Sequence, residues 1–177
     1  MTPPEINKEI DINKEISRLV EEYGNDVLRI ATVILKSKEL AEDVFQETFL
    51  RVVRSYSGYR RESSEKTWII SIAVNVCRDY MRSAWKRRVV VTDDFITYSS
   101  DSDTEEIIEK RREKQALINS IMKLPDKYRE VILLFYYQEM GVNDIAKVLR
   151  IPEGTVKSRL FKARTLLHDM IGGEAHG

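Results

Sequence analysis

Apolar residues recur at steps of three and four along most of this chain, which is the spacing of one face of an α-helix. In the first half these stripes predict helices over about 14–36, from Leu40 to Tyr56, and from about Glu65 to Lys86, the last with Ser64 as its N-cap. The apolar stripes of these helices include Leu19, Val27 and Ile30, then Val44 and Val52, and then Trp68, Ile72, Val76 and Tyr80. In the second half they predict helices from Glu105 to about Lys123, from Pro125 or Asp126 to Gly141, and over about 142–149 and 153–170. Strict alternation is confined to Val89–Thr92, which is too short to build a sheet. The pattern therefore predicts an all-α protein.

A polar, acidic stretch separates the two helical halves. No Lys or Arg occurs between Val89 and Glu109, whereas seven acids and several Ser and Thr residues do. Short polar side chains compete for backbone hydrogen bonds and so disfavour regular structure. A loop of this length is uncommon inside one compact domain. We therefore expect two small helical domains, residues 1–88 and 104–177, joined by an acidic flexible linker over residues 89–103. A single domain with a long acidic loop is the alternative.

Composition and charge exclude several classes of protein. Lys plus Arg and Asp plus Glu both number 29 among 177 residues, and hydrophobic residues make up 42%, which is too apolar and too balanced for wholesale disorder. No apolar run approaches the roughly 18 residues of a membrane span. The single Cys77 excludes an intramolecular disulfide framework, and Met1–Asp11 lacks the apolar core of a secretory signal. These features predict a cytoplasmic protein.

The most specific pattern lies between residues 141 and 167. The small Ala146 lets a second helix cross the first one closely, the turn Arg150-Ile151-Pro152 follows, and Val156 and Leu160 face inward. The outward face of the second helix carries Glu153, Thr155, Lys157, Ser158, Arg159, Lys162 and Arg164. This is the pattern of a helix-turn-helix, whose second helix enters the major groove while basic side chains reach phosphates. An ordinary helical hairpin with a solvated basic face is the alternative.

The first half carries two different polar surfaces. Asp43, Gln46 and Glu47 lie three and four residues apart, so one helix face is acidic and suits a basic protein partner, unless it is simply solvated. The second surface mixes cations with aromatic rings, as single-stranded nucleic acid requires, because bases stack on rings and phosphates follow the charges. It includes Arg60, Arg61, Lys66, Trp68, Asn75 and Arg78. Trp68 is expected to lie at least partly in the core.

Four strings of this sequence resemble, in order, the motifs of bacterial RNA polymerase sigma factors. Residues 41–49, AEDVFQETF, resemble the motif that binds core polymerase. Residues 62–68, followed by Asn75 and Asp79, resemble the promoter-melting segment. Residues 124–131 and 145–160 resemble the last domain of the family. The resemblance covers about 16–168, and the short two-domain length is similar to the extracytoplasmic-function (ECF) class.

The resemblance implies a division of labour between the two domains. The first would bind the β′ coiled coil of core polymerase through Asp43, Gln46, Glu47 and Phe49. It would hold the unpaired minus-ten strand with Arg60, Arg61, Ser63, Ser64, Lys66, Trp68, Asn75 and Arg78. The second would contact the β subunit and read the minus-thirty-five element as duplex with the helix that starts near Glu153. An anti-sigma factor, often membrane-anchored in this family, would sequester the chain.

Five residues depart from the family pattern. Ile70 and Ser71 replace the aromatic and basic residues common in the promoter-melting segment. Arg61 and Arg150 stand where glycine is common, and Gly141 takes a helix-capping position usually held by Ser or Thr. If the turn at Arg150 needs a positive φ, that residue bears strain. Arg61 and the loop around it are expected to affect promoter preference.

Other functions fit the sequence less well. A DNA-binding regulator that acts without polymerase needs a dimer interface, and no spare amphipathic helix is evident for one. A metal-dependent hydrolase needs ligands, but His168 and His176 are the only histidines and no Glu-x-x-His pair is present. We therefore expect no catalytic site, no metal or cofactor, and no small-molecule substrate. An adaptor that binds only proteins leaves the basic second helix of the helix-turn-helix unexplained.

Overall fold

The computed structural model describes residues 3–87 and 105–174, with side chains over residues 12–83, 109–110 and 112–172. The chain divides into two compact units, residues 1–92 and 93–177. The described residues contain helices and turns and no strand, so the predicted all-α, two-domain fold is confirmed. The predicted linker 89–103 and the expected helix cap Thr104 lie outside the described residues.

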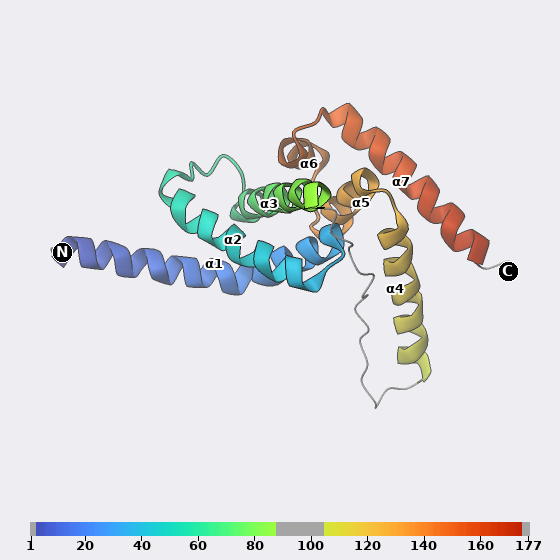
Figure 1. Cartoon of the computed structure of the whole chain (residues 1–177), viewed down its shortest axis with the longest axis horizontal. Helices are drawn as coiled ribbons and strands as arrows, with labels where there is room; N and C mark the ends of the chain where they lie inside the picture. Colours follow the sequence, from blue (N-terminus) through green and yellow to red (C-terminus); the bar gives the residue numbers. More distant parts are fainter. Residues whose placement is uncertain (1–2, 88–104, 175–177) are drawn as a thin grey trace. The chain divides into compact units, whose positions relative to one another are not determined.

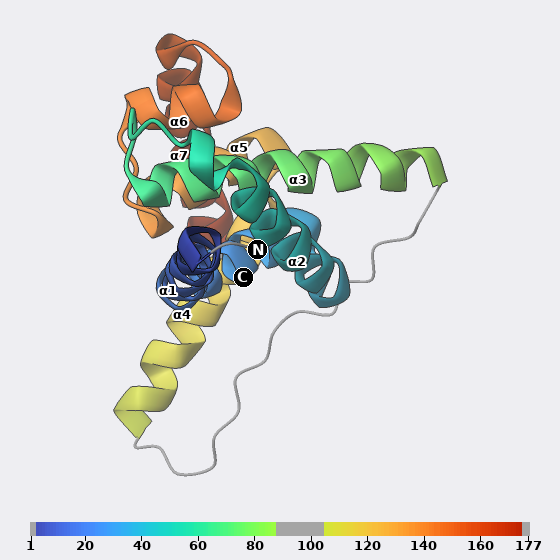
Figure 2. The same ribbon diagram turned by 90° about the vertical axis from the view of Figure 1, so that its left-hand side faces the viewer.

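The first unit is a bundle of long helices. They are α1 (Pro3–Leu35), α2 (Lys38–Ser55) and α3 (Glu65–Arg87), and a short 3₁₀ turn, η1 (Tyr56–Gly58), follows α2. Helix α1 begins about a dozen residues before the predicted start. Prolines are tolerated there because the first N–H groups of a helix have no intrahelical partner. Figure 1 shows α2 beside α1, and the perpendicular view in Figure 2 shows α1 nearly end-on with α2 and α3 to one side.

Each helix of the first unit contributes one apolar face to a common core. The predicted residues Leu19, Val27, Ile30, Val44 and Val52 are fully buried, as expected. On α3 the buried face is rotated from the prediction, because Ile70 and Val74 are fully buried while Trp68, Ile72 and Tyr80 are only half-buried. Burial of one large aliphatic side chain contributes about 1.5–3 kcal/mol, so this core holds the bundle together.

Serine side chains begin two of these helices. Ser37 accepts a hydrogen bond from the Leu40 N–H at 3.3 Å and begins α2. Ser64 accepts one from the Thr67 N–H at 3.1 Å, which confirms its predicted role as the N-cap of α3. Such caps satisfy backbone donors that have no partner inside the helix.

The second unit consists of four α-helices and a π-helical turn in its described part. The helices are α4 (Glu105–Lys123), α5 (Asp126–Ile132), α6 (Val142–Leu149) and α7 (Glu153–Glu174), and the π turn, η2 (Leu133–Tyr137), continues α5. The prediction of one α-helix up to Gly141 was wrong in this respect: the α geometry ends at Ile132. In η2 the Gln138 N–H bonds to the carbonyl of Leu133, five residues earlier, at 3.2 Å.

A buried arginine holds the corner between α4 and α5. The side chain of Arg129 is 2% exposed. Its Nη1 donates to the carbonyls of Met122 at 3.0 Å and Leu124 at 2.8 Å, and its Nη2 pairs with Asp126. The carbonyls at the end of α4 have no helical partner, so the guanidinium satisfies them. Leu124-Pro125 separates the helices, as predicted.

The turn between α6 and α7 is a Schellman motif with an arginine at its left-handed position. Arg150 has φ 55° and ψ 48°. The Ile151 N–H bonds to the Ala146 carbonyl at 3.0 Å, and the Arg150 N–H to the Lys147 carbonyl at 3.3 Å. The turn therefore does require the positive φ that glycine accepts most readily. Arg150 adopts it at some steric cost.

Candidate functional surfaces

The acidic face of α2 is largely open to solvent. Asp43 and Gln46 are exposed, and Glu47 is half-buried. The Arg51 Nε lies 2.7 Å from the Glu47 carboxylate, and its Nη1 lies 3.2 Å from Asp79 on α3. Burial, followed by the charges of Asp43 and Glu47, raises the pKa of Tyr80 on α3. The face is therefore a connected polar surface over α2 and α3.

Two apolar side chains lie on this face, and the sequence reasoning missed them. Leu50 is 50% exposed and Val53 is 45% exposed. Leu50 follows Gln46 by four residues and Glu47 by three, so its side chain lies next to theirs on the same face of the helix. The signal was available in the spacing, since the buried residues Ala41, Val44 and Val52 occupy the other side of the helix.

Phe49 does not belong to the exposed face. It is 7% exposed, and its ring centroid lies 5.0 Å from that of Phe45. The Phe49 side chain therefore lies in the core, where it orients α2, and its contact with a partner stays a prediction.

The loop between α2 and α3 is closed by aromatic contacts. Tyr59 stacks on Trp68 with ring centroids 4.6 Å apart, and its hydroxyl donates to the Ser63 carbonyl at 2.5 Å. Arg60 and Arg61 are exposed at the tip of the loop. Arg61 has φ 57°, so the second departure from glycine in this chain also occupies the left-handed region.

The remaining predicted residues of this surface divide into two groups. Ser64 is exposed, but its hydroxyl is used to cap α3. The Lys66 Nζ lies 3.7 Å from Asp26 on α1, so Lys66 faces α1. Trp68, Asn75 and Arg78 are half-buried along α3, three and seven residues apart, and so share one side of the helix.

The α6–α7 pair places the predicted residues of α7 largely as expected. Val156, Leu160 and Ala163 are buried against the rest of the unit, as are Ile145 and Val148 of α6. The predicted polar residues Glu153, Lys157, Ser158, Lys162 and Arg164 are exposed, whereas Thr155 and Arg159 are half-buried. Asn143 of α6 donates to the Glu153 carboxylate at 2.8 Å, which joins the starts of the two helices.

Arg164 is held at the flank of α7 by aromatic residues of η2. Its Nε donates to the Tyr136 hydroxyl at 2.8 Å. Its guanidinium lies 5.5 Å from the Phe135 ring centroid and 5.6 Å from that of Tyr136. These contacts turn the exposed Arg164 towards η2, and its contact with DNA stays a prediction.

Phe161 is a second residue that the sequence reasoning missed. It is 72% exposed on α7, four residues after Lys157 and three after Ser158, and so lies on the same outward face. The positions of the inward Val156 and Leu160 already implied this orientation. An exposed phenylalanine among basic residues offers an apolar contact to a base edge, such as the methyl group of thymine.

The described residues give no sign of a metal centre or a membrane span. Over that part of the chain, no group of three or more His, Cys, Asp and Glu side chains is arranged to hold a metal ion. No helix within it is long and apolar enough to cross a membrane.

Family models match both units. Residues 19–87 match the model for sigma-70 region 2, and residues 114–167 match that for sigma-70 region 4. The first match contains α2, the aromatic loop and α3 as far as Arg87, and the second contains the α6–α7 pair.

Curated relatives match almost the whole chain. The ECF RNA polymerase sigma factor SigM of Bacillus subtilis is 34% identical over 152 residues, which are 86% of this chain and 92% of that protein. The ECF RNA polymerase sigma-E factor of Haemophilus influenzae is 30% identical over 167 residues, 89% of this chain and 88% of the relative. The sigma factor RpoE of Bartonella quintana, solved with the anti-sigma factor NepR, has a similar fold: TM-score 0.75, 20% identity, 90% of this chain and 98% of that one.

Proposed function

This chain belongs to the ECF family of RNA polymerase sigma factors, and we propose that its surfaces divide the work of promoter recognition among α2, α3 and α7. It binds core RNA polymerase and directs it to specific promoters. The observation that supports the proposal is that a match to sigma-70 region 2 precedes a match to region 4 in this chain. Each matched unit has exposed polar side chains that suit its proposed partner. The chain has no catalytic role of its own in the proposal, and needs no metal, cofactor or small-molecule substrate.

The face of α2 is the proposed contact with polymerase. Asp43, Gln46 and Glu47 supply charge and hydrogen bonds to a basic coiled coil of the β′ subunit. Leu50 and Val53 supply the apolar centre that most protein interfaces need, since a few desolvated side chains carry most of the binding free energy. We therefore propose Leu50 and Val53, in place of the buried Phe49, as the apolar contacts of this interface.

The loop between α2 and α3, with the exposed side of α3, is the proposed minus-ten site. Arg60, whose guanidinium lies 4.0 Å from the Glu62 carboxylate, and Arg61 are both exposed and can meet phosphates. The stacked Tyr59 and Trp68 form an aromatic platform beside them. Asn75 and Arg78 extend this surface along α3. Ser63 and Ser64 contribute through the geometry of the loop, since Ser63 accepts the Tyr59 hydroxyl and Ser64 caps α3.

The start of α7 is the proposed reader of the minus-thirty-five duplex. Lys157, Ser158 and Phe161 form its outward face. Glu153, Thr155, Arg159 and Lys162 flank that face, and Arg164, which contacts η2, lies at its edge. We also propose contact of this unit with the β subunit of polymerase, and control by an anti-sigma factor in the bacterial cytoplasm. An inhibitor anchored in the membrane would hold the chain at the membrane surface.

The direct test is transcription reconstituted from purified parts. We expect core polymerase to start transcripts from a subset of a randomised promoter pool when this chain is added, and not when it is omitted. Sequencing the selected templates gives the two promoter elements. A chain that fails to associate with core polymerase, or associates without starting transcripts, contradicts the proposal; binding to DNA without polymerase would favour the independent regulator instead.

Two single variants separate phosphate contact from base reading on α7. Lys157→Ala is expected to weaken holoenzyme binding to selected and scrambled upstream elements alike, and to lower the slope of log K against log salt by about 1, because one phosphate contact is lost. Phe161→Ala is expected to weaken only the selected element, by about 1–3 kcal/mol, if the ring contacts a thymine methyl. Electrophoretic titrations at several salt concentrations measure both. Equal losses on both DNAs for Phe161→Ala would exclude base reading by this side chain.

A further inference from the structure

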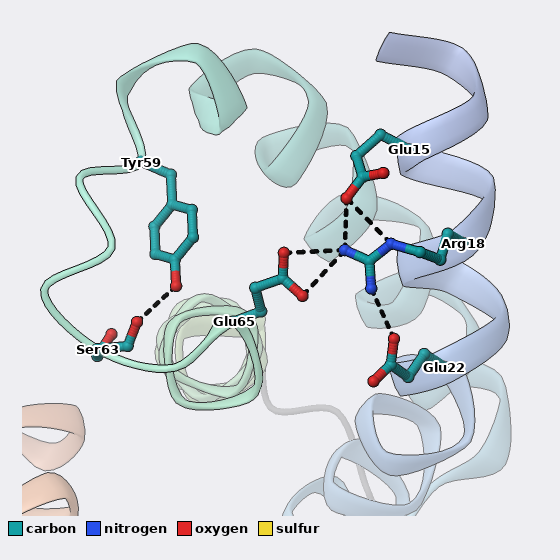
Figure 3. A network of polar contacts seen from close by, with 6 residues as sticks. All are labelled: Glu15, Arg18, Glu22, Tyr59, Ser63 and Glu65. Atoms are coloured by element: carbon teal, nitrogen blue, oxygen red, sulfur yellow. Dashed lines mark hydrogen bonds and ion pairs between the residues drawn. The ribbon is translucent and has the colours of Figure 1, made fainter. Parts of the chain in front are cut away.

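Helix α1 is joined to the aromatic loop by one guanidinium that contacts three carboxylates (Figure 3). The Arg18 Nη2 lies 2.9 Å from both carboxylate oxygens of Glu65, which is the first residue of α3. The same nitrogen lies 2.5 Å from Glu15, and Nη1 lies 2.7 Å from Glu22. Arg18 and Glu65 are 47 residues apart in sequence, so this contact connects α1 to the end of the loop.

The same group of side chains also reaches the beginning of the loop. Hydrogen bonding to Arg18, and then to the Tyr56 hydroxyl, lowers the pKa of Glu15. Tyr56 begins η1, which leads into the loop. The contact fixed by geometry is that of Arg18, which joins Glu15 on α1 to Glu65 at the end of the loop.

A second ion pair strengthens this attachment. Lys66, next to Glu65, lies 3.7 Å from Asp26 on α1. Both of the first two residues of α3 are thus paired with an opposite charge on α1. Single exposed ion pairs contribute little free energy. When one guanidinium pairs with several carboxylates, only one basic side chain has to be ordered for several contacts. Its planar N–H groups also fix the direction of each hydrogen bond more than an ammonium group does.

The contacts inside the loop depend on the start of α3, which Arg18 and Asp26 hold. The loop contains the strained Arg61, and within it Tyr59 closes onto Ser63. The cap of α3 lies directly before Glu65, where the Thr67 and Trp68 N–H groups bond to Ser64. A shift of Glu65 therefore moves the Ser64 cap and the Trp68 ring on which Tyr59 stacks.

We propose that Arg18 is a positioning residue for promoter recognition: by bridging Glu15 and Glu65 it holds the loop in the shape that receives the unpaired minus-ten strand. This inference rests on the proposed minus-ten site. Arg18 itself need not touch DNA. It lies on a helix in which the sequence analysis identified no site residue. Its contribution is to order the loop in advance, so that less conformational entropy is lost when DNA binds.

The test compares Arg18→Ala with Arg18→Lys and with Arg29→Ala, an exposed arginine on the same helix. In the free full-length chain, hydrogen exchange of residues 57–68 is expected to be faster in Arg18→Ala and unchanged in Arg29→Ala. In the holoenzyme, affinity for a single-stranded minus-ten oligonucleotide from a selected promoter is expected to fall about tenfold in Arg18→Ala, which corresponds to 1.4 kcal/mol. Affinity for a scrambled strand and association with core polymerase are expected to stay unchanged. Arg18→Lys restores part of the loss because lysine keeps an ion pair without the fork.

The outcomes separate this inference from the proposed function. The variant Arg60→Ala with Arg61→Ala removes charges of the loop itself. If it weakens the selected strand while Arg18→Ala behaves as Arg29→Ala, the positioning role is wrong and the proposed minus-ten site stands. If neither variant weakens that strand, both are wrong. If Arg18→Ala weakens core association and both strands equally, Arg18 merely stabilises the bundle, and the inference is overturned.

Discussion

Replacing Leu50 by lysine is expected to lower transcription from every promoter at limiting chain concentration while leaving the chain folded. Leu50 is half-exposed among Asp43, Gln46 and Glu47, so its removal opens no cavity. Lysine is a good helix former, and an exposed substitution usually changes the free energy of unfolding by less than about 0.5 kcal/mol. At the proposed interface, however, the change removes an apolar contact and introduces a positive charge that repels a basic partner.

The expected loss in affinity for core polymerase is at least about tenfold, or 1.4 kcal/mol, and falls within the range of hot-spot residues. Fluorescence anisotropy of labelled chain with core polymerase measures it, and circular dichroism checks the fold. Leu117→Lys is the matched control, because Leu117 is 40% exposed on α4, which belongs to the second unit. Leu50→Ala is expected to give a smaller loss, since it removes the contact without adding repulsion. If Leu50→Lys and Leu117→Lys bind core polymerase equally well, the proposed interface on α2 is misplaced.

Replacing Arg129 by alanine is expected to produce the largest loss of stability, confined to the second unit. The buried guanidinium satisfies the carbonyls of Met122 and Leu124, and its removal leaves these acceptors without a partner in an apolar environment. Each unsatisfied buried group costs about 1–3 kcal/mol, so the loss of both partners is expected to cost about 2–6 kcal/mol. This is a large part of the stability of a small domain.

Hydrogen exchange in the full-length chain locates the effect of this change. Amides of α5 to α7 are expected to lose protection in Arg129→Ala, while those of α1 to α3 keep it. Arg129→Lys is expected to be intermediate, because an ammonium cannot reproduce the fork. Lys127→Ala, two residues away and exposed, is the control. Association with core polymerase through α2 is expected to persist, with recognition of the upstream promoter element lost. Unchanged protection of α5 to α7 would show that the corner between α4 and α5 does not depend on this arginine.

Much of the architecture was predictable because helical periodicity is local. Leu19, Val27 and Val52 were assigned to the core from spacing alone, and each is fully buried. Ser64 was recognised as a cap because a helix start places unpaired N–H groups within reach of a serine three residues earlier. The inward positions of Val156 and Leu160 followed in the same way, and they oriented α7 well enough to identify its exposed face.

The sequence analysis was least accurate where residues were assigned from a family motif and not from their helical spacing. Phe49 was included with its exposed neighbours because it belongs to the same string, although the helical repeat places it on the buried side with Phe45. Leu50 and Phe161 were overlooked because apolar residues were assumed to face the core. The same repeat places both of them outward.

The amino-acid sequence by itself determined the all-α class, the helix pair of the second unit and the polar faces, because these depend on residues three and four positions apart. Tertiary structure alone decided which charges meet. Arg18 pairs with Glu65, Lys66 with Asp26, and Arg164 with Tyr136, and each pair lies on different helices. Many alternative pairs of similar free energy are possible in a chain with 29 bases and 29 acids. Only the packing of the apolar faces fixes the helix directions that bring one set within hydrogen-bonding distance.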